Sequence, residues 1–168
     1  MYKIDDLVMY RNIGVCKIVD ITKREQFDSV GEYYTLKPVN DERSTIFVNV
    51  NNKNVMMRYL LPAEEVRSIV DNLEQIDGYS CDNDRERDAH YRELINSGKT
   101  TNWVQVIKGL YHRKLDRNKK GKDLSQQEER LFRTAEKLFY SEISCVLNIP
   151  MEQVVDYITE KVGHSIRV

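Results

Sequence analysis

The side chains best suited to metal binding or nucleophilic catalysis are scattered along this sequence. The histidines and cysteines are His90, His112, His164, Cys16, Cys81 and Cys145. They form neither a helix-spaced histidine pair nor a Cys-x-x-Cys motif, the arrangements that hold a tetrahedral metal ion. A glycine-rich phosphate loop and a Gly-x-Ser-x-Gly motif are also absent from the sequence. The sequence therefore predicts no catalytic residue, no metal ligand set and no cofactor. An enzyme is the weaker hypothesis and would need a deep pocket with converging polar groups.

Adjacent acids and single cysteines have simpler structural interpretations. Asp5-Asp6 and Glu64-Glu65 stand at the starts of predicted elements, where negative charge favours a helix N-terminus or solubility. Cys16 falls in a strand pattern and Cys145 on a helical stripe, so both are predicted to pack in the core. The odd number of cysteines argues against a disulfide framework. With no signal-like or membrane-length apolar stretch, we expect a cytoplasmic protein.

A run of basic residues suggests a polyanionic partner. Residues 108–122 hold seven basic side chains and one acid. Lys and Arg at this density can neutralise several phosphates and give salt-dependent binding to nucleic acid. The alternative is a solvated helix end, where each cation favours the macrodipole by about 0.3–1 kcal/mol. Composition alone favours the second interpretation, and the net charge of −1 means that any nucleic-acid contact must be local.

The first 61 residues have the pattern of a small β domain. Turn residues separate five short segments that are rich in β-branched and aromatic residues. These segments are 7–10, 15–19, 33–36, 45–48 and 56–60. They predict a small antiparallel barrel of the Tudor or SH3 type, with a long hairpin that turns at residues 28–31. An exposed edge strand of such a barrel is a usual docking place for a partner, and self-association through it stays open.

From residue 62 to 168 the apolar period becomes helical and predicts an all-α bundle, so the fold class is α+β with two domains. Pro62 and Pro150 suit helix starts, and residues 77–84 form a loop. Ser125 to Glu128 is a capping box. Gly98 suits a left-handed helix end, and hydroxyl capping is expected at Thr100-Thr101.

Two groups of apolar residues define the predicted helical core. Trp103 shares helical spacing with Ile107 and Leu110, which favours packing over stacking on a nucleic-acid base. On the next helix the predicted core stripe consists of Leu131, Ala135, Leu138 and either Cys145 or Val146. Residues 62–96 hold ten acids and four bases, so the bases available there for DNA are Arg85, Arg87 and Arg92.

Several motifs together resemble the CarD/CdnL family of bacterial transcription regulators. In the first half the resemblance rests on residues 2–10, 13–16, 32–37 and 46–48. In the second half it rests on residues 94–98, 103–110 and 124–135. Each motif is weak alone, but their order and spacing together are fairly specific. This family shares its first domain with the transcription-repair coupling factor.

The resemblance implies a non-enzymatic protein that bridges RNA polymerase and promoter DNA without a cofactor. The barrel would pair strand to strand with the polymerase β subunit through Arg24 and the segment Thr45, Ile46, Phe47 and Val48. The helical domain would contact DNA at the upstream edge of the melted bubble and stabilise the open complex. The candidate DNA-contacting positions are Asp84, Arg85, Arg87, Arg113, Lys114, Arg117, Lys119, Lys120, Arg130 and Arg133.

Three positions depart from the family pattern. Phe47 stands where members often carry an arginine on the docking strand. Asp84, after Asn83, stands where many members carry a tryptophan that wedges into DNA, and an aspartate repels phosphate. Glu129 replaces a basic residue. The alternative hypothesis is therefore an adaptor that binds polymerase or another partner without touching DNA.

Overall fold

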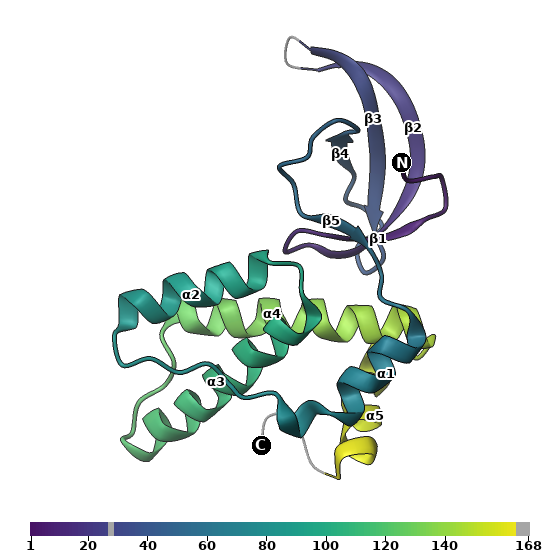
Figure 1. The fold of residues 1–168 in the computed structure, drawn as a ribbon. Coiled ribbons are helices and arrows are strands. Elements are labelled where there is room, and N and C mark those ends of the chain that lie inside the picture. Colours follow the sequence, from purple (N-terminus) through teal and green to yellow (C-terminus); the bar gives the residue numbers. More distant parts are fainter. Residues whose placement is uncertain (27–28, 164–168) are drawn as a thin grey trace. The chain divides into compact units, whose positions relative to one another are not determined.

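The computed structural model describes residues 1–26 and 29–163 (Figure 1). The chain forms two compact units, Met1–Leu60 and Leu61–Val168, so the division lies one residue before the expected one. The first unit is a β unit and the second is helical.

The β unit is a five-stranded antiparallel sheet with the order β4-β3-β2-β1-β5. Its strands are β1 (Leu7–Tyr10), β2 (Gly14–Gln26), β3 (Ser29–Pro38), β4 (Ile46–Asn49) and β5 (Met57–Tyr59). The strand order makes β4 and β5 the two edges of the sheet. The five predicted strands are confirmed, although β2 and β3 are longer than predicted.

The sheet bends around a core whose buried residues come from β1 to β4, and Met57 of β5 packs against it. A register shift between Ile18 and Asp20 marks a bulge in β2, which adds local twist. The buried core residues are Val8, Tyr10, Cys16, Ile18, Tyr34, Leu36 and Val48. Cys16 is fully buried, which confirms its predicted packing role.

The strands β2 and β3 form the predicted long hairpin, and they curve together in Figure 1. Their pairing continues to Gln26 opposite Ser29, well beyond the predicted ends. The predicted turn begins at Asp28, which lies outside the described residues. Polar residues fill this outer part of the hairpin, so hydrophobic alternation underestimates the strand length.

The helical unit packs its two longest helices against each other and places the shorter ones around them. Its elements are α1 (Ala63–Asp71), η1 (Leu73–Gln75), α2 (Asp84–Asn96), α3 (Thr100–Lys119), α4 (Gln126–Leu147), η2 (Met151–Gln153) and α5 (Val154–Val162). The helix α2 packs on α3 and α4, whereas α1 and α5 pack on each other and on α4. Within the described residues, no helix combines the length and apolarity needed to cross a membrane.

The helix ends follow the predicted signals, with one exception. Ser125 and Glu128 form the predicted capping box at the start of α4. Gly98 has φ 71°, the left-handed conformation expected after α2. The prediction of hydroxyl capping at Thr100-Thr101 is wrong, because Lys99 is the N-cap and makes no side-chain cap. The Thr100 hydroxyl instead donates to Oε2 of the buried Glu142 at 2.7 Å.

The predicted helical core is largely confirmed. Trp103 is fully buried and its Nε1 donates to the Ile95 carbonyl at 3.1 Å. On α4 the residues Leu131, Ala135 and Leu138 are buried as expected. Cys145 and Val146 are only half-buried, so the predicted stripe is wrong at its end. It closes one turn earlier, at the fully buried Ile143.

Candidate functional sites: an edge strand and an ion-pair cluster

The strand β4 presents one apolar side chain outward at the edge of the sheet. Val48 is buried and Ile46 is half-buried, while Phe47 between them is 36% exposed. This alternation follows from the pleat, which turns successive side chains to opposite faces. Thr45 is exposed and precedes the strand, so it is not part of β4.

The position of β4 in the sheet makes it a template for strand addition. In the described part of the chain β4 pairs with β3, where Phe47 lies opposite Thr35. An edge strand can accept an extended partner through backbone hydrogen bonds. Arg24 lies in β2 opposite Gly31, but its side chain is outside the described part of the structure.

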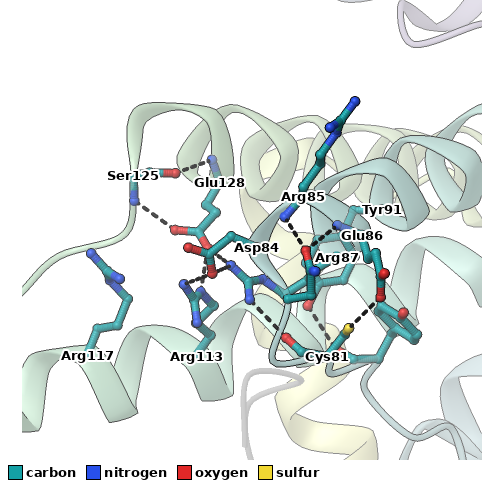
Figure 2. Close-up of polar contacts among 12 residues, drawn as sticks. Cys81, Asp84, Arg85, Glu86, Arg87, Tyr91, Arg113, Arg117, Ser125 and Glu128 are labelled. Atoms are coloured by element: carbon teal, nitrogen blue, oxygen red, sulfur yellow. Dashed lines mark hydrogen bonds and ion pairs between the residues drawn. The ribbon is translucent and has the colours of Figure 1, made fainter.

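A buried arginine on α2 is the centre of an ion-pair cluster in the helical unit (Figure 2). Arg87 is 2% exposed. Its Nη2 donates to Asp84 Oδ1 at 2.7 Å and to Glu128 Oε1 at 2.9 Å. Its Nη1 donates to the Cys81 carbonyl at 2.9 Å. A charge buried this deeply needs such partners, because it has lost its hydration.

Glu128 joins this cluster to the start of α4 and to α3. Its Oε1 also accepts a hydrogen bond from Nε of Arg113 on α3, and Arg113 Nη2 lies 3.2 Å from Asp84 Oδ1. Its Oε2 accepts from the Ser125 backbone N–H at 2.8 Å, which closes the capping box. One carboxylate thus caps α4 and neutralises arginines of α2 and α3. The sequence signals the cap but not the pairing, since Arg87 is 41 residues away.

The cluster shifts the acidity of its members. Burial disfavours the charged form of Glu128, but the hydrogen bonds from the Ser125 backbone and Arg113 outweigh it and hold the pKa of Glu128 below its usual value. The hydrogen bond and the positive charge of Arg87 lower the pKa of Asp84. Nearby, burial raises the pKa of Tyr91 to about 12, and its hydroxyl donates to the Tyr79 carbonyl at 2.7 Å.

The structure corrects part of the predicted DNA-contacting set. Arg87 is buried and fixed to Asp84 and Glu128, so it is not on the surface that DNA could reach. Lys108 of the basic run is also buried, and its Nζ donates to the Leu73 carbonyl at 2.7 Å. Arg113 is mostly buried within the cluster. Asp84 remains largely exposed while it pairs with both arginines.

The remaining predicted cations lie on the surface of three helices. Figure 2 shows the Arg85 side chain pointing away from the ion-pair cluster. Arg85 on α2, Lys119 on α3, Lys120 at the end of α3, and Arg130 and Arg133 on α4 are exposed, whereas Lys114 and Arg117 on α3 are half-buried. These cations therefore do not come from one continuous segment.

The described residues offer no metal-binding group. Within residues 1–26 and 29–163, no group of three or more His, Cys, Asp or Glu side chains is placed to hold a metal ion. His164, a histidine of the sequence, is outside that range.

The half-buried Arg117 donates its Nε to the Asp123 carbonyl at 2.5 Å, which fixes it beside the end of α3.

Comparison with known families accounts for both units. The family model of the CarD-like/TRCF RID domain matches residues 2–60, which correspond to the β unit. The model of the CarD C-terminal domain matches residues 68–159 of the helical unit. A search of curated proteins gave no significant match. The second family model alone covers more than half of the chain, and the first adds the β unit. The chain therefore belongs to the CarD family of RNA polymerase-interacting transcription regulators.

Proposed function

We propose that β4 docks on the β subunit of RNA polymerase by strand addition, while exposed cations of the helical unit contact promoter DNA and stabilise the open complex. The observation that carries the docking proposal is the place of β4 at the edge of a sheet that matches the RID domain. A second extended strand can pair there through its backbone. The side chain that distinguishes this edge is Phe47.

Phe47 supplies an apolar contact where a partner strand would lie. Its side chain is partly exposed in the free protein, so docking would remove further apolar area from water. Fully burying a phenylalanine stabilises by about 1.5–3 kcal/mol, and the exposed part contributes a fraction of this. A carboxylate at the same place would have to lose its hydration on docking. We therefore expect Phe47→Asp to weaken binding by at least about tenfold, or 1.4 kcal/mol.

Calorimetric titration against the isolated β-subunit lobe tests the docking proposal. The matched control is Ile4→Asp, which places the same charge at another exposed apolar residue of the β unit, before β1. The wild type and Ile4→Asp should bind alike, and Phe47→Asp should bind more weakly. Equal binding of Phe47→Asp and the wild type would refute docking through β4.

The DNA contact is proposed for the exposed arginines and lysines of α2, α3 and α4. Each phosphate that a cation neutralises releases counterions, so binding weakens as salt increases. Arg130→Gln, at an exposed position without a described ion pair, should lower the slope of log K against log salt by about one unit if it contacts one phosphate. In the companion variant Arg133→Gln the slope should change less. Arg133 lies 3.6 Å from Glu129 and its charge is already partly neutralised.

The second candidate function is a polymerase-binding adaptor without DNA contact. Two acids favour it: the exposed Asp84 at the start of α2, and Glu129 in the first turn of α4. Both place negative charge where a phosphate backbone would be repelled. Measurement of duplex binding at low salt separates the candidates. Binding that weakens steeply with salt supports the bridging function, and no binding at low salt supports the adaptor.

A further inference from the structure

The helical unit contains a cavity of about 410 Å³ between α3 and the loop that precedes α2. The lining residues from α3 and its C-cap are Gly109, His112, Arg113, Asp116, Arg117 and Lys120. Their spacing of three and four residues places them on one face of the helix. The loop contributes residues 78 and 80–82, and α2 contributes Arg87 and Tyr91. A cavity of this size is on the scale of small-molecule sites.

The cavity is preformed because the loop is fixed on both sides. Gly109 allows the loop to lie directly on α3, since a Cβ there would come 2.1 Å from the Tyr79 carbonyl oxygen. The same carbonyl accepts the Tyr91 hydroxyl hydrogen bond at 2.7 Å. Arg87 holds the next part of the loop through the Cys81 carbonyl. A ligand would therefore meet walls that need little rearrangement.

The lining combines directed donors with a modest charge. Asp84 and Glu128 neutralise Arg87 and Arg113, so these two arginines add little net field. The remaining lining charges are Arg117 and Lys120 against Asp82 and Asp116. Asp116 lies 3.5 Å from Nζ of Lys119, which offsets part of its charge. This balance disfavours a highly charged polyphosphate and suits a single phosphate group.

The donors themselves point to an oxyanion. Arg117 uses its Nε for the Asp123 carbonyl, and no described residue bonds its two Nη groups. Lys120 is exposed at the cavity and has no described ion pair. Arg87 also lines the cavity, and its buried Nε has no hydrogen-bond partner among the described residues. Arginine and lysine together are a common phosphate-binding pair.

We propose that this cavity binds a phosphate ester of about nucleotide size, with its phosphate at Arg117 and Lys120. The remaining volume beside Ser80 and His112 would hold the neutral part of the ligand. The same phosphate chemistry is present in a small ester and in a DNA backbone, and both would use the same two cations. A bound ester would then compete with DNA at this end of α3. The proposal does not depend on docking through β4.

Calorimetric titration of the full chain with adenosine monophosphate and with adenosine tests the proposal. The phosphate ester should bind and the nucleoside should not. Arg117→Gln and Lys120→Gln should each weaken binding by about tenfold or more, the effect of losing one charge-assisted hydrogen bond. Arg67→Gln, which changes an exposed arginine of α1 outside the cavity and outside the proposed DNA-contacting helices, should bind like the wild type. Lys120→Gln changes an exposed side chain, so its fold should be intact.

A short duplex DNA separates the two sources of phosphate. If the monophosphate binds and the duplex displaces it in the wild type, the cavity serves both. If only the duplex binds, and both variants weaken it while Arg67→Gln does not, the two cations bind the DNA backbone and the proposal of a small phosphate ester is overturned. Equal binding of adenosine and its monophosphate, or equal binding by the wild type, Arg117→Gln and Lys120→Gln, would overturn the proposal. If neither the monophosphate nor the duplex binds, the proposal is also overturned.

Discussion

Replacement of Glu128 by glutamine should destabilise the helical unit far more than the same replacement at the neighbouring Glu129. Glu128 is 2% exposed and accepts hydrogen bonds from Arg87, Arg113 and the Ser125 backbone. Glutamine has nearly the same shape but no charge, and it has one acceptor oxygen in place of two. The buried Arg87 would then keep Asp84 as its only described carboxylate partner.

The size of the effect follows from this geometry. Removing one partner of a buried ion pair costs about 3–5 kcal/mol, because the other charge stays buried. The retained carbonyl oxygen and Asp84 place Glu128→Gln near the lower end, at about 3 kcal/mol. A domain of this size is stabilised by about 5–15 kcal/mol, so the loss is large. With a urea m value of about 1–3 kcal/mol/M, the unfolding midpoint should fall by about 1–3 M.

Fluorescence of Trp103 is the appropriate assay. It is the only tryptophan of the chain and is buried in the helical unit, so its signal reports the unfolding of that unit. The matched control is Glu129→Gln, one residue away, where the carboxylate pairs with the 77% exposed Arg133 side chain. An exposed pair contributes about 0–1 kcal/mol, so the control should unfold near the wild-type midpoint. Equal midpoints for Glu128→Gln and Glu129→Gln would refute the role assigned to the cluster.

Two further predictions concern acidity and the loop on α3. The pKa values of Asp84 and Glu128 are lowered in the folded protein, so their contribution to stability is complete above the unfolded values of about 4 and is lost as the pH falls through the folded ones. The Trp103 unfolding midpoint should therefore fall with acidification, and less steeply in Glu128→Gln; parallel pH profiles would contradict this. Gly109→Ala should lower the thermal midpoint despite alanine's better helix propensity of about 1 kcal/mol, because its Cβ would collide with the Tyr79 carbonyl. A raised midpoint in a thermal melt would show that the loop moves away without cost.

The elements of this protein could be predicted from local sequence signals, whereas its ion-pair cluster could not. Strand alternation, the Ser125 capping box and the Gly98 helix end all act within a few residues, and all are present in the structure. Arg87 appears from the sequence to be one more surface base in an acidic, polar helix. Its burial depends on Glu128, which only the folded bundle brings to it.

The sequence does not show which cations of the basic run are buried. The run from residue 108 to 122 has the composition of a phosphate-binding surface, yet Lys108 is buried and Arg113 is mostly buried. Each contacts a different part of the unit: the Leu73 carbonyl accepts from Lys108, and the carboxylates of Asp84 and Glu128 pair with Arg113. By contrast, the single exposed residue of β4, Phe47, follows directly from strand alternation.

Hydrogen exchange of the backbone amides with and without the isolated polymerase β-subunit lobe tests the central claim most directly. Strand addition should protect amides of β4 (Ile46–Asn49) and leave the opposite edge, β5 (Met57–Tyr59), unchanged. The protection should disappear in Phe47→Asp and persist in Ile4→Asp. Protection confined to β5, or to the helical unit alone, would contradict docking through β4.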